Sequence, residues 1–175
     1  MKDLSPDEEM ASTVGLLFSA VNENIERLKS IVSGISREEL EYKGEHGDKN
    51  SIAQLIYHLI NVDVRWVYRL KESEIPRELE EKYGPMTDEN GRLPEVTGVP
   101  LTVLIEWHEE VLEMLKHTAK GFSEKDLLKK VTYEGGFSTI RWGIWHMSDH
   151  NRYHQAHIQA CLKRVPHAKQ LIFFV

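Results

Sequence analysis

The sequence is short of cysteine, of long apolar runs and of excess positive charge, and each shortage excludes a class of protein. Its 175 residues contain one cysteine, Cys161, which excludes an internal disulfide framework and a zinc site built from several thiolates. No run approaches the roughly 18 apolar residues of a membrane-spanning helix. With 22 basic against 28 acidic residues, the net charge of −6 disfavours a nucleic-acid partner. Any metal site must therefore use nitrogen and oxygen ligands.

The remaining composition is that of an ordinary globular protein, with 41% hydrophobic and 29% charged residues. We expect a single domain over residues 1–175, long enough to bury about two-thirds of the surface of the unfolded chain. The N-terminal stretch "MKDLSPDEEM" is acidic and shows no signal-peptide pattern. A cytoplasmic protein with no membrane partner is the expectation.

Four long amphipathic patterns predict an all-α protein. The first helix is expected to begin with Ser5 as its N-cap and to end at Gly34. The others are expected over residues 51–70, 101–120 and 139–165, the second opening with a capping box in "NSIAQ". Four such helices predict a four-helix bundle.

The connections between these helices are uneven in length. Residues 74–100 hold four prolines and three glycines, which predicts a long crossover with one helical turn between the second and third helices. "SREEL" predicts a short turn, "SEKDLLKK" a short helix and "TYEGGFST" a glycine-hinged loop. The closing "QLIFFV" is apolar and β-prone, so we expect a short extended tail that packs on the domain or on a second copy, and we predict a homodimer.

Four of the nine histidines lie within "HMSDHNRYHQAHI" and form one stripe on the expected fourth helix. His146, His150, His154 and His157 fall within a sector of about 80°, which overlaps the apolar side. His146 and His154 are about 12 Å apart along the helix, too far for one ion with metal–nitrogen bonds of about 2.0–2.1 Å. Only pairs three or four residues apart can share an ion. His150 and His154 each belong to two such pairs and are the best candidate ligands.

A third histidine on another helix would complete the site. His58 lies three residues after Leu55 and four before Val62, so it faces the inside of the bundle. Three histidines would leave coordination positions open for water or substrate, as in catalytic metal sites. The alternative is a hydrogen-bonded core histidine. Spacing alone leaves both interpretations open.

Other polar residues near these positions are weaker candidates. Asp63 and Asp149 are interpreted as exposed acids, with a role as hydrogen-bond acceptors near the site as the alternative. Tyr153 either donates a hydrogen bond near the site or packs. His108 and Glu109 are further candidates to face the same cavity. The four tryptophans are expected in the core or in the wall of a pocket.

At "HMSDHNRYHQAHIQACLKR" the sequence resembles the fourth-helix signature of the DinB superfamily, approximately H-x-x-N-H-x-x-Y-H-R-G-Q-I-x-x-x-L. This superfamily includes the bacillithiol and mycothiol S-transferases. The match places His150 and His154 on the two metal histidines of the family, with Tyr153 and Ile158 in register. The first metal histidine of the family lies within a second-helix phrase like L-x-x-H-L, and "LIYHLI" supplies His58 at that place.

The chain also departs from that pattern. Gln155, Ala156 and His157 replace the R-G-Q of the signature, and Asp149 replaces the usual asparagine. These changes alter the surroundings of the site but leave the three histidines intact.

The resemblance implies a function. It implies a DinB/YfiT-like bundle in which His58, His150 and His154 hold zinc or nickel, which activates a low-molecular-weight thiol for attack on a small electrophile. Two alternatives stay open: a metal-dependent hydrolase with Asp149, Asp63 or Glu109 as base, and a non-catalytic bundle that binds a metal or a small molecule. The sequence assigns neither catalytic nor cofactor-binding residues beyond the three ligands.

Overall fold

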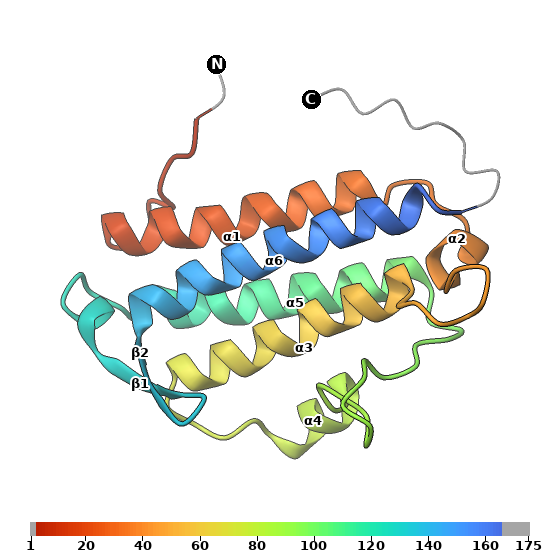
Figure 1. Cartoon of the computed structure of the whole chain (residues 1–175). Helices are drawn as coiled ribbons and strands as arrows, with labels where there is room; N and C mark the ends of the chain where they lie inside the picture. Colours follow the sequence, from red (N-terminus) through yellow and green to blue (C-terminus); the bar gives the residue numbers. More distant parts are fainter. Residues whose placement is uncertain (1–2, 166–175) are drawn as a thin grey trace.

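The computed structural model describes residues 3–165, and four long helices dominate it (Figure 1). These helices are α1 (Ser12–Ile31), α3 (Ile52–Leu70), α5 (Leu101–Ala119) and α6 (Ile140–Leu162). α1 packs against α5 and α6, and α3 packs against the same two helices, so the four enclose one core. The predicted all-α fold is confirmed. The predicted extended tail lies outside the described residues.

Three short helices and a small sheet complete the described part of the chain. They are α2 (Arg37–Glu41), α4 (Arg77–Tyr83), the 3-10 helix η1 (Asp126–Leu128) and the strands β1 (Lys130–Tyr133) and β2 (Gly136–Thr139). The short turn, the crossover with its helical turn and the short helix predicted from the sequence correspond to α2, α4 and η1. Within residues 3–165, no helix is long and apolar enough to cross a membrane.

The long crossover lets two neighbouring helices run in the same direction. α3 and α5 both run from the end of the bundle near α2 to the end near the hairpin, whereas α1 and α6 run the opposite way (Figure 1). Parallel neighbours cannot be joined by a tight turn, so the chain between them must return along the bundle. The segment that contains α4 makes this return along one side of α3.

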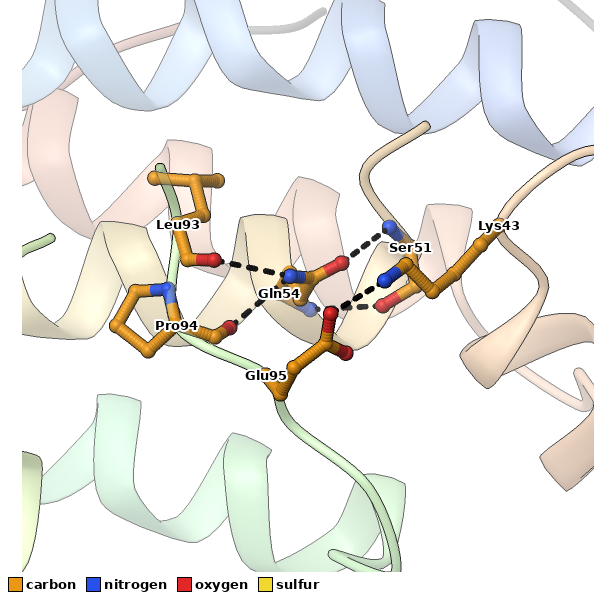
Figure 2. A network of polar contacts seen from close by, with 6 residues as sticks. All are labelled: Lys43, Ser51, Gln54, Leu93, Pro94 and Glu95. Carbon is orange, nitrogen blue, oxygen red and sulfur yellow. Dashed lines mark hydrogen bonds and ion pairs between the residues drawn. The ribbon is translucent and has the colours of Figure 1, made fainter. Parts of the chain in front are cut away.

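The start of α3 also anchors the crossover (Figure 2). Ser51 and Gln54 form the predicted capping box: the Ser51 hydroxyl accepts from the Gln54 backbone N–H at 3.1 Å, and the Gln54 side-chain oxygen Oε1 accepts from the Ser51 backbone N–H at 3.0 Å. The Gln54 side-chain amide then donates to the carbonyls of Leu93 and Pro94 at 3.1 and 3.0 Å. One buried side chain therefore caps a helix and fixes the crossover against it.

We expect Gln54→Leu to destabilise the protein more than Ser51→Ala does. The serine variant loses one cap, which costs about 1 kcal/mol. The leucine variant loses half of the same capping box and also leaves two half-buried carbonyls of the crossover without this donor, each at up to about 1 kcal/mol because water can partly replace it. Urea denaturation of both variants measures the difference, and equal midpoints would show that the crossover gains nothing from Gln54.

The predicted start of the first helix is wrong. α1 begins at Ser12 rather than after Ser5, and no side chain caps it. The preceding segment folds back on α1 instead: a Cβ added at Gly15 would lie 2.5 Å from the Asp7 carbonyl oxygen. Asp7 also forms an ion pair with Lys116 of α5 at 3.3 Å. These tertiary contacts override the local capping signal.

The segment "TYEGGFST" forms part of a β-hairpin, so its prediction as a loop is also wrong. β1 and β2 pair antiparallel, with Tyr133 opposite Gly136. The two residues between them, Glu134 and Gly135, have φ angles of +45° and +77°. Two successive left-handed residues define the tight turn that joins hairpin strands with their natural twist. The Glu-Gly pair is the local signal for this turn.

Candidate metal centre

The structure brings the three predicted ligands together. His58 lies near the middle of α3, and His150 and His154 lie one turn apart on the facing side of α6. One nitrogen from each ring lies within 4.8 Å of the other two, and all three side chains are half-buried. Among the described residues, no other group of three histidine, cysteine or acidic side chains converges in this way.

The orientation of the rings fits a small divalent ion. The Nε2 atoms of His150 and His154 face each other at 3.1 Å, and two ligands of a tetrahedral ion with bonds of about 2.0–2.1 Å lie roughly 3.3 Å apart. The His58 ring lies 5.2 and 4.8 Å from these two rings, measured between centroids, and meets both edge-on. The donor set and its spacing therefore suit zinc, nickel or a similar ion.

Burial keeps these imidazoles unprotonated. Burial, together with the smaller effect of neighbouring histidine charges, lowers the pKa of His150 to about 4 and that of His154 to about 3. Burial also lowers the pKa of His58, although the charge of Asp63 opposes the shift. Metal ions bind the neutral ring. The lone pairs needed for coordination are thus available at neutral pH.

The lowered pKa values predict that acid destabilises the metal-free protein. A histidine has a pKa of about 6.5 in the unfolded chain, so between that pH and its lower folded value the unfolded state binds more protons. The free energy of unfolding should fall as pH drops below about 6.5, and continue to fall toward pH 4 for His150 and pH 3 for His154. Urea denaturation with a chelator at pH 7.5, 6.5 and 5.5 measures the slope. The variant His154→Gln should show a shallower slope, and an unchanged slope would contradict the assignment.

His146, the first histidine of the stripe, belongs to an aromatic cluster rather than to the three-histidine group. Its ring stacks on Trp142 at 4.6 Å and lies 5.4 Å from Trp66 and 6.0 Å from Tyr133. The distance from His146 to the His150 ring is 5.7 Å. His146 therefore connects the histidine group to the β-hairpin side of the bundle.

His157, the last histidine of the stripe, lies on the exposed side of α6 beside His154. The Nδ1 atoms of the two rings are 3.4 Å apart, and the exposed Tyr153 ring lies 4.5 Å from His157. When a histidine binds a metal through Nε2, its Nδ1–H usually donates to a neighbouring group. His157 occupies the place of that group for His154. Tyr153 packs against both histidines.

Sequence reasoning missed a buried polar network beside this group. Asp63, interpreted as an exposed acid, is in fact 1% exposed. Its Oδ2 accepts hydrogen bonds from His108 Nε2 at 3.0 Å and from Asn151 Nδ2 at 2.8 Å, so that α3, α5 and α6 meet at one oxygen. Both partners are fully buried. His108 was expected to face the cavity of the histidine site. It does face the interior of the bundle, but it contacts Asp63 there.

A periodic signal for this network was present in the sequence. Asp63 follows Leu59 by four residues and precedes Trp66 by three, which is the spacing of the apolar seam of α3. His108 follows Leu104 by four residues on α5 in the same manner. A polar side chain at a seam position is expected to be buried, and buried polar groups require partners.

The remaining candidates lie away from the three histidines. Glu109 forms an ion pair with Lys29 of α1 at 2.7 Å, and Asp149 is exposed on α6. Trp145, expected in the core or a pocket wall, is 46% exposed. None of these side chains contributes to the histidine group.

A hollow of about 880 Å³ opens next to the aromatic cluster, between the end of α3, the segment before α4 and the hairpin. Tyr133 lines this hollow, and its ring lies 5.0 Å from Trp66 and 6.0 Å from His146. Arg69 lies over both aromatic rings, 4.5 Å from Trp66 and 5.1 Å from Tyr133. Trp66 and Tyr133 thus form an aromatic wall between the hollow and His146, which lies outside the three-histidine group.

A helical bundle with three convergent histidines fits a metal-binding protein. Residues 20–158 match the sequence model of the DinB superfamily, and the chain belongs to that superfamily. It is similar to a protein of Bacillus subtilis (strain 168) named "Uncharacterized protein YkkA", with 56% identity over 164 residues that cover 93% of this chain and 94% of the relative. The resemblance seen in the two histidine phrases is therefore confirmed at the level of the family.

Proposed function

We propose that this protein is a metal-dependent thiol S-transferase in which His58, His150 and His154 hold zinc or nickel. The observation that carries the proposal is the convergence of three neutral imidazoles from two helices within 4.8 Å. Three protein ligands are the usual number at catalytic zinc sites, where another position stays open for a reactant.

The residues of the chain have distinct parts in this proposal. His58, His150 and His154 bind the ion, and His157 orients His154 through its Nδ1. When bound, a divalent ion at this place supplies Lewis-acid chemistry that lowers the pKa of a low-molecular-weight thiol and so favours the nucleophilic thiolate. Because the three histidines are half-buried, the ion would be partly shielded from solvent but could still be reached by a small thiol.

The aromatic wall and the hollow supply space for the non-reacting part of a small-molecule substrate. Binding pockets are commonly concave, of about 300–1,000 Å³, and lined by aromatic side chains with a few polar groups. The hollow beside Tyr133 has this size, and Arg65 and Arg69 are among the charged residues that line it. Tyr133 lies 6.0 Å from His146, whose ring is 5.7 Å from that of His150, and this chain of rings supports the proposal that the hollow serves the histidine site.

No observation favours the hydrolase alternative. It needs a carboxylate base near the ion, and the three candidates are buried and hydrogen-bonded (Asp63), ion-paired (Glu109) or exposed on α6 (Asp149).

The proposal also includes one domain over residues 1–175, a cytoplasmic location and a homodimer. Light scattering of the full chain measures the mass that tests the dimer.

The proposed activity is tested by mixing the metal-loaded protein with a thiol and chloro-dinitrobenzene and following the conjugate by absorbance. We expect thiol consumption above the uncatalysed rate, and its loss on treatment with a chelator. Variants of the three histidines should be inactive, whereas His46→Ala, which changes an exposed histidine of the connector after α2, should remain active. A loaded protein that binds metal fully but consumes no thiol with this or a bimane electrophile would contradict the transferase proposal.

A further inference from the structure

A buried carboxylate lies in the core beside the three histidines without a strong cation to neutralise it. Asp63 is the only buried carboxylate among residues 3–165. In this part of the chain no lysine or arginine forms an ion pair with it, and its one ionisable hydrogen-bond partner is His108. Burial of an unpaired charge is costly in free energy. A negative charge on Asp63 would therefore require a compensating positive charge nearby.

The hydrogen bonds of the network assign its protons. His108 Nδ1 and Asp63 Oδ1 are both buried, and neither has a hydrogen-bond partner in the protein. A His108 ring protonated on both nitrogens would bury an N–H without an acceptor, so the neutral tautomer that donates from Nε2 fits best. A carboxyl proton on Oδ1 would likewise lack an acceptor, and Oδ2 already accepts from two donors. The pattern is that of a carboxylate, and the network carries one negative charge.

The network is directly connected to the helices that bear the histidines. Asn151, which donates to Asp63, follows His150 in α6 and also donates to the Met147 carbonyl at 3.0 Å. Asp63 itself follows His58 by five residues in α3. Asp63 nevertheless makes no hydrogen bond to any of the three candidate ligands.

We propose that Asp63 is the counter-charge of the metal centre, a positioning residue that stabilises a divalent ion on His58, His150 and His154 through its buried negative charge. The inference rests on the proposed metal site. Three neutral imidazoles leave both positive charges of the ion uncompensated, and opposite charges attract strongly where water is excluded. In turn, the ion compensates a carboxylate whose Oδ1 has no hydrogen-bond donor. His108 and Asn151 hold the carboxylate in place.

The substitution Asp63→Asn removes the charge and keeps the shape. We expect zinc affinity to fall about tenfold or more, because the charge opposite to that of the ion is lost from a site of low effective dielectric. The free energy of unfolding of the metal-free protein should change little or fall modestly, because removal of the buried charge offsets the burial of an amide NH2 that finds no acceptor in the place of Oδ1. Competition with a chromogenic chelator measures the affinity, and urea denaturation with a chelator measures the stability.

A matched control separates charge from packing. Gln155 follows His154 in α6, is equally buried and donates to the Asn24 carbonyl of α1 at 2.7 Å, but it carries no charge. The variant Gln155→Met should lower the stability of the metal-free protein and leave zinc affinity within about twofold. Cobalt loading of all variants adds a spectroscopic readout: the visible bands should keep their positions in Asp63→Asn, because the three ligands are unchanged.

Two outcomes would overturn the inference: unchanged zinc affinity in Asp63→Asn, or a loss of zinc affinity that Gln155→Met matches. If Asp63→Asn does not fold, the double variant Asp63→Leu/His108→Leu removes both partners together and should show the same loss of affinity. The unsubstituted protein is titrated first. Failure of that protein to bind zinc contradicts the proposed function, whereas normal binding with an unaffected Asp63→Asn variant contradicts only the present inference.

Discussion

Replacing His150 with alanine should abolish metal binding, with a loss of affinity of at least about 100-fold. Loss of a partner outside the ligand set already costs about 10- to 100-fold, and loss of a ligand itself costs more. The His150 ring lies 4.5 Å from that of His154 and 5.2 Å from that of His58, measured between centroids. His58 and His154, whose rings are 4.8 Å apart, would remain as two ligands on different helices, fewer than the three protein ligands that catalytic zinc sites usually have. Metal analysis of tag-free protein after zinc loading measures the bound equivalents.

The variant His46→Ala is the control for this result, because His46 is exposed and lies outside the histidine group. It should bind one equivalent of zinc, as the unsubstituted protein does. Thermal unfolding adds a second measurement: zinc should raise the midpoint of the unsubstituted protein and of His46→Ala, but not that of His150→Ala, because a ligand stabilises only the state that binds it. One full equivalent of tightly bound zinc in His150→Ala would exclude the three-histidine site.

Replacing Trp66 with alanine should cause the largest loss of stability of any single substitution considered for this protein. Trp66 is 1% exposed and joins α3 to the hairpin and to α6, with ring distances of 5.0 Å to Tyr133 and 5.7 Å to Trp142. The backbone of α6 also approaches it closely, since a Cβ added at Gly143 would lie 2.7 Å from the Trp66 ring. A cavity in such a place cannot collapse easily. We expect a cost of about 3–5 kcal/mol, a large part of the roughly 5–15 kcal/mol that stabilises a typical domain.

A second tryptophan provides the matched control. Trp145 is on α6 and is 46% exposed, so Trp145→Ala removes the same atoms from a site where water replaces them. Its cost should stay below about 1 kcal/mol, as for most surface substitutions. Urea denaturation of both variants measures the comparison. Similar costs for the two substitutions would mean that the aromatic cluster does not support the junction of α3, α6 and the hairpin.

Much of the fold follows from local patterns in the sequence. The bounds of α3, α5 and α6 agree closely with the predicted ranges, because the apolar seams and the Ser51 capping box act within a few residues. The start of α1 was not predictable in this way. It depends on tertiary contacts: Asp7 packs against Gly15 of α1 and forms an ion pair with Lys116 of α5, which is distant in the sequence.

For the histidine group too, the sequence predicts some features, and others depend on how the helices pack. The rise of a helix selects His150 and His154 as neighbours on one face, and the apolar spacing around His58 turns it inward as the third candidate, which the family signature also matches. The sequence alone does not state how far apart the rings of two helices lie, since that distance depends on the packing of α3 against α6. Packing also separates His146, which stacks on Trp142, from the other histidines of the stripe.

By itself the sequence determined the all-α class, the long crossover and the three candidate ligands, because helix periodicity and the two histidine phrases are local properties of the chain. Only the tertiary structure decided that Asp63, His108 and Asn151 share one buried oxygen and that the hairpin closes the aromatic wall. The physical reason is burial. Whether a carboxylate faces water or another helix depends on residues distant in the sequence, and the same location sets its charge, its hydrogen bonds and its effect on the histidines.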